Sequence, residues 1–459
     1  MKTFTLPERA LPLDDSWEVI VAGGGPAGCT AAIAAARAGA RTLLIEATGS
    51  LGGSGTSALV PAWCPFSDKQ KIIYRGLAET VFTAAKAGIA HVAKSDLDWV
   101  PIDAERLKRV YDELVTEAGV TVLFQTFLSA VETDGDGSVA TLVVSNKAGL
   151  TALRAKVYVD CTGDADLAAW AGAEFQKGDP DGDMQPATHC FLLTNVDEKA
   201  YRTGPRIFGG NPESPIHAIL QSGRHPMIPD AHICNNLVGP GTVGFNAGHL
   251  WNVDNTDPAS VSQALRNGRR MAAAYRDALA EFAPAAFGNA FLAATGSVVG
   301  IRETRRIVGE YLLTLDDYLA RRSFDDEICR NAYFIDVHLT QQEARQSERI
   351  DVEKRVAHYR PGESHGIPYR CLTPRGLKNV LVAGRSISCE RIVHGSIRVM
   401  PVCLAMGEAA GLAAAMAVQL AEGNVHRIDA GILRRRLRSA GAYLPETPAE
   451  TAAGLAAVT

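Results

Sequence analysis

The sequence has few of the features by which proteins hold metals or bind polyanions. Its nine cysteines are scattered singly, with no C-x-x-C pair and no group of cysteine and histidine at metal-ligand spacing. We therefore predict no metal site, and the odd count without a disulfide-like framework favours a reducing compartment. With 46 Lys and Arg against 51 Asp and Glu, the formal net charge of −5 offers no general attraction to nucleic acid or anionic lipid.

Long apolar runs are also missing, apart from segments rich in alanine. Residues 1–17 carry acids and prolines instead of the apolar stretch of a signal peptide. We therefore expect a cytoplasmic protein with no membrane span and no nucleic-acid partner. The oligomeric state stays open, with a homo-oligomer as one option.

What the sequence does contain is enough apolar material for more than one core. Hydrophobic residues make up 47% of the 459 residues and charged residues 21%, which is typical of a globular protein. From about residue 175 prolines, glycines and histidines become frequent, and a buried-strand pattern returns near Asn379. We predict an α/β protein with a discontinuous Rossmann-like domain, residues 1–172 and 366–459, that combines a mixed βαβ sheet with a small β-meander. An interleaved α+β substrate domain would occupy residues 173–365.

The clearest motif lies at the start of the Rossmann-like domain. The apolar run 19–22 ends in a G-x-G-x-x-G string formed by Gly23, Gly25 and Gly28, and a small-residue helix and a second strand follow. Such a turn lets a diphosphate approach backbone N–H groups at the N-terminus of a helix. Glu46, at the end of the second strand, is placed to accept hydrogen bonds from ribose hydroxyls. Together these features predict a dinucleotide-binding βαβ unit.

A second glycine string, at residues 239–244, lacks this context. No small-residue helix follows it, so we predict a turn that enters a strand. A dedicated second domain for NAD(P)H is therefore not indicated.

Five segments resemble the bacterial FAD-dependent oxidoreductase family, within the two-dinucleotide-binding-domain flavoproteins that have a glutathione-reductase-type FAD domain. They are Val21–Gly28, Leu51–Gly53, Gly300–Ile307, Val382–Ser388 and Arg398–Pro401.

The resemblance implies FAD as the cofactor, with its adenine beside a strand at residues 120–127. The FAD-binding residues that it implies are Gly23, Gly25, Pro26, Ala27, Gly28, Glu46, Gly53, Ser54, Phe127, Gly163, Gly384, Arg385, Met400 and Pro401. One position departs from the wider superfamily, in which an aspartate often follows the glycine of the last strand and holds the ribityl chain. Here Arg385 follows Gly384, so the residue that holds the ribityl chain is left open.

The candidates for catalysis are His394, Arg398 and Arg302. Arg398 precedes a helix whose N-terminus is expected to face the flavin, and His394 lies in the loop before it. Each also has a simpler interpretation, because a lone histidine commonly bonds to backbone and the arginines at 302, 305 and 306 are suited to internal ion pairs with Glu303. His338 and Tyr369 are weaker candidates of the same kind as His394.

These observations predict an FAD-dependent oxidoreductase in which hydride passes between a small organic substrate and FAD at the interface of the two domains. The dehydrogenase or oxidase direction is favoured, with the electron acceptor or donor unknown. One alternative is a flavin-dependent reductase of an activated double bond. Others are a non-catalytic flavoprotein that binds RNA or a protein partner, and an NAD-dependent dehydrogenase that uses the first βαβ unit.

Overall fold

The computed structural model describes residues 2–5, 7–345 and 358–446. Its larger unit is built on a five-stranded parallel sheet with the strand order β17-β8-β2-β3-β4. The strands are β2 (Val19–Ala22), β3 (Thr42–Ile45), β4 (Thr121–Leu123), β8 (Val157–Asp160) and β17 (Val380–Val382). Every residue of the four strands other than β4 is buried, as expected of a parallel sheet that is covered on both faces.

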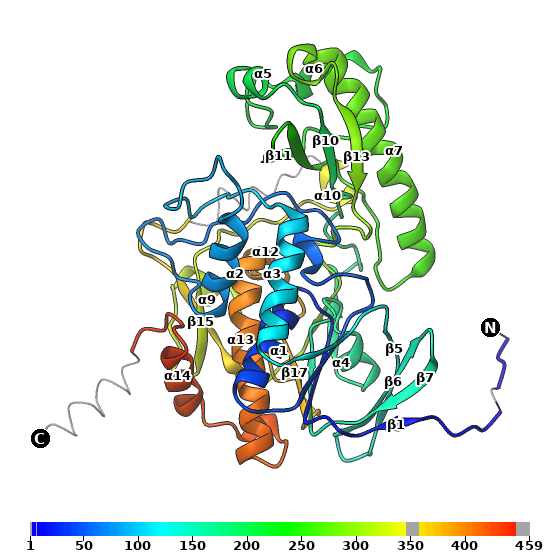
Figure 1. Ribbon diagram of the computed structural model, residues 1–459, viewed down its shortest axis with the longest axis vertical. Coiled ribbons are helices and arrows are strands. Elements are labelled where there is room, and N and C mark those ends of the chain that lie inside the picture. Colours follow the sequence, from blue (N-terminus) through cyan, green and yellow to red (C-terminus); the bar gives the residue numbers. More distant parts are fainter. Residues whose placement is uncertain (1, 6, 346–357, 447–459) are drawn as a thin grey trace, which may run out of the picture.

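Two helices rich in small residues pack on one face of this sheet. They are α1 (Pro26–Arg37) and α13 (Met400–Leu420), which lie side by side in the middle of the larger unit (Figure 1). A Cβ atom at Gly411 would lie 1.9 Å from the carbonyl oxygen of Ala31, so this close approach needs glycine. Within the described residues α13 is the one helix long and apolar enough to cross a membrane, and it is mostly buried inside the molecule.

Further helices surround this pair. They are α2 (Leu77–Lys86), α3 (Ala104–Glu117), α12 (Arg391–Ile397) and α14 (Ala430–Ser439). The bounds of α3 agree closely with the helical spacing of residues 104–118 in the sequence. The helix expected to begin at Pro401 begins one residue earlier, at Met400.

Glu408 of α13 gives the fold a testable pH dependence. Its side chain is buried against Gly76, and one carboxylate oxygen accepts the N–H of Leu77 at 2.9 Å. Burial raises the pKa of Glu408 to about 7, from a usual value of 4.5. Because the folded protein then binds this proton more tightly than the unfolded chain, Glu408 should lower the free energy of unfolding as pH rises from 4.5 to about 7.

We expect Glu408→Gln, which keeps the shape of the protonated acid, to remove this loss. Its Tm should exceed that of the wild type at about pH 8 and equal it near pH 4. Thermal melting followed by circular dichroism measures both, with the more exposed Glu79→Gln as a control. A variant that is less stable than the wild type at both pH values would contradict the assignment.

The other face of the parallel sheet is covered by a four-stranded sheet with the order β1-β7-β6-β5. Its strands are β1 (Leu13–Asp14), β5 (Phe127–Thr133), β6 (Val139–Asn146) and β7 (Gly149–Leu153). Two runs that the sequence suggests as single strands are divided in the structure. Residues 153–160 separate into the end of β7 and the central strand β8, and residues 120–127 into β4 and the start of β5. Strand propensity marks both runs, but it does not tell which sheet each residue joins.

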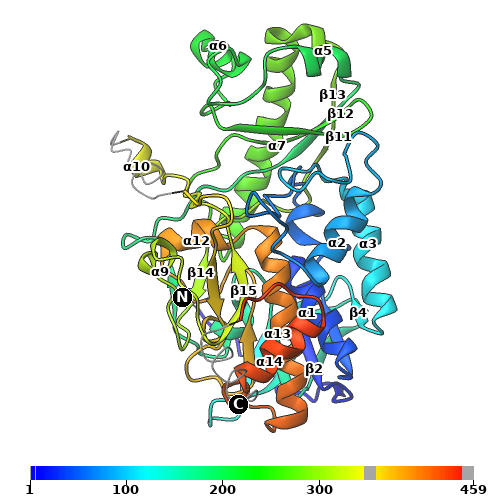
Figure 2. The same ribbon diagram turned by 90° about the vertical axis from the view of Figure 1, so that its left-hand side faces the viewer.

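The smaller unit forms the other end of the molecule (Figures 1 and 2). Its sheet has the order β11-β12-β10-β13, with β10 (Phe191–Thr194), β11 (Ile233–Gly239), β12 (Thr242–Ala247) and β13 (Phe291–Thr295). Helix α7 (Pro258–Phe282) packs on it, accompanied by α5 (Glu198–Thr203), α6 (Pro215–Ser222) and α8 (Pro284–Phe287). In the sequence, Asp257 before Pro258 predicts a helix from about Pro258 to Phe282, and α7 has these bounds; Asp257 caps it by accepting the N–H of Ala259. The second glycine string forms the turn between β11 and β12, also as predicted.

The described residues form three hydrophobic cores, two of them in the larger unit and the third in the smaller unit alone, which supports the division into two units. The core of the smaller unit extends from Ala187 to Val299, and it includes the stacked rings of Phe191 and Phe245. Residues between Leu313 and Ile335 instead pack into a core of the larger unit. The domain limits 1–172, 173–365 and 366–459 stay a prediction.

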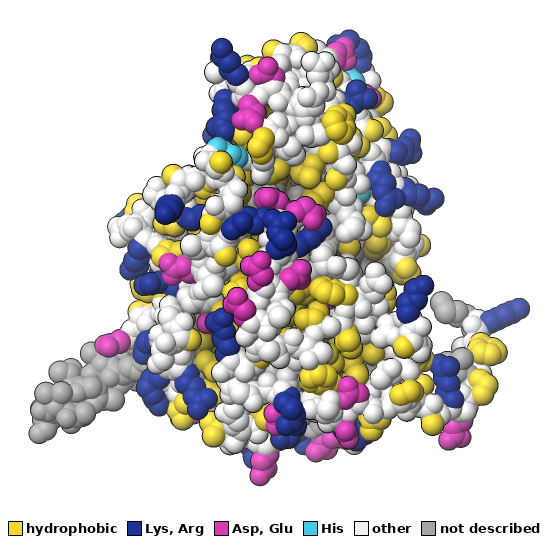
Figure 3. Space-filling view, in the orientation of Figure 1, with side chains coloured by type: hydrophobic (Ala, Val, Ile, Leu, Met, Phe, Trp, Pro, Cys, Tyr) yellow, Lys and Arg dark blue, Asp and Glu magenta, His cyan; other side chains and the backbone are white. Residues whose placement is uncertain are grey.

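Short elements complete the structure. They are α4 (Asp166–Trp170), β9 (Phe175–Lys177), β14 (Arg305–Ile307), α9 (Leu315–Leu319), β15 (Glu327–Asn331), α10 (Gln341–Arg345), β16 (His365–Pro368) and the 3₁₀ turns η1 (Gly53–Gly55), η2 (Tyr369–Cys371) and η3 (Val425–Arg427). On the face shown in Figure 3, acidic and basic side chains lie interspersed.

Candidate functional site

A cavity of about 430 Å³ lies where the carboxyl ends of β2, β3, β8 and β17 meet the smaller unit. Such an edge of an open parallel sheet is where nucleotide-binding folds hold their ligands. Of the predicted FAD-binding residues, those that line it are Gly23, Gly25, Pro26, Ala27, Glu46, Gly53, Ser54, Phe127, Gly163, Gly384, Arg385 and Met400. The smaller unit contributes Val261 and Leu265 of α7 and the segment 297–301.

The three glycines of the first motif have separate structural roles. Gly23 has a φ of +95°, and a Cβ there would lie 2.4 Å from the carbonyl oxygen of Cys161. A Cβ at Gly28 would lie 1.7 Å from the carbonyl oxygen of Gly23, so Gly28 serves packing and does not line the cavity. Gly25 faces open space, with nothing within 4 Å of the position that a Cβ would take. It therefore leaves room for a diphosphate at the N-terminus of α1.

Glu46 joins the end of β3 to this glycine turn. One carboxylate oxygen accepts the N–H of Gly24 at 2.6 Å, and the other accepts the N–H of Thr48 at 2.7 Å. Each oxygen keeps a second acceptor position. Because Glu46 also lines the cavity, its carboxylate is held where it can accept hydrogen bonds from ribose hydroxyls.

Arg385, the residue that departs from the superfamily pattern, pairs with Asp164 on the cavity wall. Its guanidinium lies 2.7 Å from Oδ1 of Asp164 and donates to Oγ1 of Thr304 at 2.9 Å. Thr304 and Asn255 donate to the same carboxylate, each at 2.5 Å. The Asp164–Arg385 pair thus joins the ends of β8 and β17 to the smaller unit.

We expect Arg385→Ala to destabilise the protein by about 3 kcal/mol, because it leaves the carboxylate of Asp164, 5% exposed, without its cation. Urea unfolding measures the change. The double variant Asp164→Asn with Arg385→Ala should recover part of the loss, since it no longer buries an unpaired charge. A double variant that is as unstable as Arg385→Ala would argue against the ion pair as the cause.

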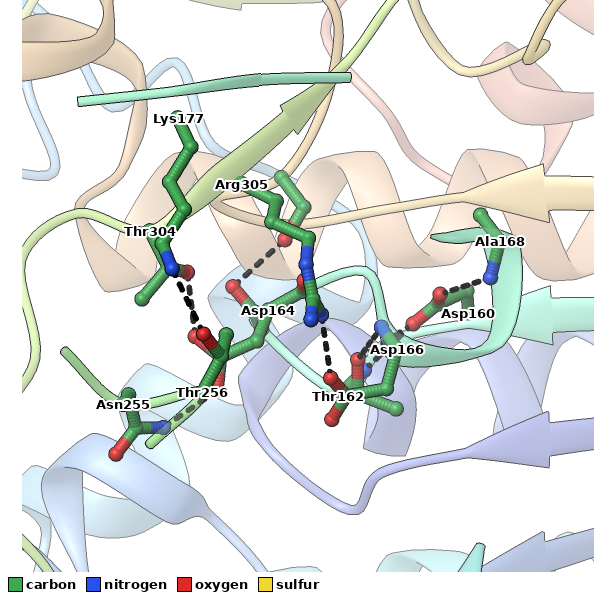
Figure 4. Close-up of polar contacts among 12 residues, drawn as sticks. Asp160, Thr162, Asp164, Asp166, Ala168, Lys177, Asn255, Thr256, Thr304 and Arg305 are labelled. Atoms are coloured by element: carbon green, nitrogen blue, oxygen red, sulfur yellow. Dashed lines mark hydrogen bonds and ion pairs between the residues drawn. The ribbon is translucent and has the colours of Figure 1, made fainter. Parts of the chain in front are cut away.

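A second set of contacts fixes the turn after β8 (Figure 4). Asp160, whose pKa burial raises to about 6, accepts hydrogen bonds from Thr162 and from the N–H of Ala168. Arg305 pairs with Asp166 at 2.7 Å, so its partner is not the expected Glu303, which instead pairs with Arg306. These contacts hold the backbone of the turn against the cavity.

Arg398 is the catalytic candidate that lines the cavity. Its guanidinium donates to the carbonyl oxygen of Asp336 at 2.9 Å and lies 3.6 Å from the Asp336 carboxylate. Within the described part of the chain, its buried Nε has no hydrogen-bond partner. Arg398 therefore brings a positive charge to the wall of the cavity.

The other catalytic candidates do not line the cavity. Arg302 donates to the carbonyl oxygen of Pro186 and to Thr188, and it is not among the lining residues. His394 lies on α12 and not in a loop as expected; it is buried, and its Nε2 lies 2.8 Å from the carbonyl oxygen of Arg385. Burial lowers the pKa of His394 well below its usual value, so the ring is neutral. Tyr369 is also buried, and it donates to the carbonyl oxygen of Val425.

The structure also brings together residues that the sequence does not single out. Asp164 follows the predicted Gly163 directly, and its place at the end of a buried strand is a signal available in the sequence. His338, a weaker candidate from the sequence, lies at the junction of the two units with His232 and His249, which the sequence does not single out, and their ring nitrogens are within 4.8 Å of one another. No sequence motif predicts this cluster, because the three histidines come from distant segments of the chain.

The site accommodates the group that the glycine motif predicts. The open space at Gly25, the start of α1 beside it and the oriented carboxylate of Glu46 match a diphosphate and a ribose. Pro401, buried in the first turn of α13, does not line the cavity, whereas Met400 beside it does.

Comparisons with solved structures give distant similarities over nearly the whole chain. A geranylgeranyl bacteriochlorophyll reductase-like protein from Thermoplasma acidophilum is 13% identical, with 94% of this chain and 83% of that chain covered and a TM-score of 0.44. The p-nitrophenol 4-monooxygenase PnpA from Pseudomonas putida DLL-E4 is 13% identical, with 96% and 92% covered and a TM-score of 0.43. The aromatic hydroxylase CabE, from angucycline biosynthesis, is 14% identical, with 93% and 68% covered and a TM-score of 0.45. At these TM-scores the similarities carry no argument about the reaction.

The family comparison is more informative. A family model described as FAD dependent oxidoreductase matches residues 18–437, which include both the glycine turn and α13. The match covers most of the chain, and the cavity has the features that a dinucleotide needs. This chain therefore belongs to the FAD-dependent oxidoreductase family, and it is an enzyme whose cofactor is FAD.

Proposed function

We propose that the enzyme oxidises a small organic substrate, which binds beside Arg398 at the junction of the two units. The observation that carries this proposal is the place of Arg398 on the wall of the cofactor cavity, beside the start of α13. The other arginine that lines the cavity, Arg385, is paired with Asp164 at 2.7 Å, whereas the guanidinium of Arg398 lies 3.6 Å from the nearest carboxylate in the described part of the chain, that of Asp336. A carboxylate or carbonyl oxygen on the substrate would suit a guanidinium.

Bound FAD supplies the hydride acceptor, and the protein supplies position and charge. The N-terminus of α13 begins at Met400 on the cavity wall, so its free N–H groups and positive dipole end can stabilise negative charge developing there. His394, on α12, is bonded to the backbone of Arg385, and we propose that it positions the segment that follows β17.

The test begins with the visible spectrum of the purified protein, repeated on the supernatant after acid precipitation. Flavin absorption that moves into the supernatant identifies non-covalent FAD, and colour left in the pellet identifies covalent attachment. The oxidised holoenzyme is then mixed without oxygen with a panel of 2-hydroxy acids, amino acids, amines and alcohols. We expect at least one member to bleach the flavin.

The same purified holoenzyme is used to test the direction of the reaction. If no panel member bleaches the flavin but activated alkenes reoxidise the dithionite-reduced enzyme, the reductase alternative replaces the dehydrogenase. If neither happens, the proposal of an oxidised small substrate fails, and a flavoprotein that binds a partner takes its place.

A further inference from the structure

Four side chains form a continuous line across the junction of the two units, and we call them the relay: Asp230, His249, His338 and Asp336. Nδ1 of His249 lies 2.9 Å from the carboxylate of Asp230. Nε2 of His249 lies 2.8 Å from Nδ1 of His338. Nε2 of His338 lies 3.4 Å from the carboxylate of Asp336, which makes this the longest contact of the relay.

Counting hydrogens shows that the relay is one proton short when both rings are neutral. Each of its three contacts needs one N–H, and two neutral imidazoles carry only two. Assigning both hydrogens to the two short contacts places one on Nδ1 of His249 and one on Nδ1 of His338. Nε2 of His338 is then a bare lone pair that faces a carboxylate. One added proton at this atom would complete every contact.

The charges around the relay balance while the rings are neutral. Arg398 lies beside Asp336, and Arg302 donates to Nε2 of His232 at 3.1 Å. These two cations offset the carboxylates of Asp230 and Asp336. Burial, then Arg302 and Arg398, lower the pKa of His338 below its usual value, although Asp336 opposes them. The ring is therefore unprotonated at neutral pH, and an anionic substrate on Arg398 would offset that cation and make His338 more basic.

The other groups that face the relay are few. Tyr333 donates to the carboxylate of Asp336 at 3.2 Å, and the ring of Trp251 lies 5.7 Å from that of His249. The thiols of Cys64 and Cys234 are close enough to Asp336 for its charge to raise their pKa, after burial as the larger cause. These groups contact Asp336 or His249, and none of them donates a hydrogen bond to Nε2 of His338.

A metal ion is the competing occupant of this cluster, because three histidines meet here. The rings of His232 and His249 are stacked, with centroids 4.4 Å apart and planes within 3°, so their nitrogens lie in separate parallel planes. One ion cannot lie in both ring planes, as imidazole coordination requires. The guanidinium of Arg302 also occupies Nε2 of His232. The geometry thus favours a proton over a metal.

We propose that His338 is the base that accepts the substrate's proton, with His249 and Asp230 as the positioning residues behind it. This inference rests on the proposed function. As hydride leaves the substrate carbon for FAD, the O–H or N–H bond on that carbon breaks. Its electron pair would form the C=O or C=N bond, and its proton would pass by way of the Asp336 carboxylate, which lies 3.6 Å from Arg398, to Nε2 of His338. Neither Asp336 nor His338 is among the residues that line the cavity, so His338 would be the final proton acceptor behind Arg398.

The kinetic test uses stopped-flow bleaching of the holoenzyme by the panel compound that reduces it. His338→Gln should lower the limiting rate of bleaching about 100-fold or more, with little change in the compound's dissociation constant. His249→Gln should lower it about 10-fold, as expected of a residue that acts through its neighbour. Added imidazole should restore activity to His338→Ala and not to His249→Ala. His217→Gln, on α6 and bonded to the backbone of Asn211, is the matched control.

A second measurement does not need a substrate. In holoenzyme labelled with ¹⁵N-histidine, NMR at neutral pH should show His249 and His338 as neutral rings, each protonated on Nδ1, and His249→Gln should change the tautomer or the protonation of His338. Two rings that titrate independently near their usual pKa would overturn the proposal, and so would one equivalent of bound metal found by elemental analysis.

If no panel compound bleaches the flavin while the NMR result holds, the proposed function fails and the relay stands. If bleaching occurs but His338→Gln does not slow it, the proposed function stands and the base assignment fails.

Discussion

Replacing Gly25 by valine is expected to weaken FAD binding about 100-fold without unfolding the protein. Gly25 lines the cavity, and nothing lies within 4 Å of the position that a Cβ would take. The folded chain therefore has room for the new side chain, and the diphosphate does not. The loss follows because the backbone N–H groups at the start of α1 can no longer be approached closely.

The chain offers a matched control in its second glycine string. Gly239 also has open space around its Cβ position, but it ends a strand of the β11–β12 hairpin in the smaller unit. Gly239→Val should retain FAD as the wild type does. Gly28→Val, whose Cβ would lie 1.7 Å from the carbonyl oxygen of Gly23, should instead lower stability as well as FAD content. Flavin fluorescence titration of the apoprotein measures FAD binding, and thermal melting measures the stability of the three variants. Equal loss of FAD in the Gly25 and Gly239 variants would refute the assignment of the diphosphate site.

Features fixed by neighbouring residues could be predicted from the sequence. The turn at Gly23–Gly28 and the bounds of α7 follow from backbone geometry and from the cap at Asp257, which involve only a few adjacent positions. The division of residues 153–160 between two sheets could not be predicted in this way. It depends on which strands lie beside them, and those strands come from other parts of the chain.

The candidate site is harder to predict than the fold, because its contacts join residues that are far apart in the sequence. Arg385 could be recognised as a departure from the superfamily pattern, but its partner Asp164 lies 221 positions away. His338 and His249 are 89 positions apart and belong to different units, so neither pattern nor spacing joins them. The sequence favours His394 for its place near the flavin-facing helix, yet its buried ring bonds to the backbone. Tertiary contacts decide which side chain of each type faces the cavity.

Arg398→Ala is expected to slow substrate-driven flavin reduction by about 100-fold to 1000-fold while FAD retention changes much less. The guanidinium touches both the cavity and the Asp336 end of the relay, so its removal takes away the substrate's charged partner and also the cation beside Asp336. Arg398→Lys should recover part of the binding but not the rate, because a point charge does not replace a planar donor pair.

The measurement is anaerobic stopped-flow reduction over a range of substrate concentrations, together with FAD content and Tm for each variant. Arg370→Ala, which removes an exposed partner of Asp326, controls for the loss of an arginine elsewhere on the larger unit. If Arg398→Ala loses FAD in proportion to its rate, Arg398 is a cofactor or structural contact and the substrate must bind elsewhere. If the rate falls while the FAD content and Tm hold, Arg398 acts on the reacting molecule, and the relay beside it is placed to receive the released proton.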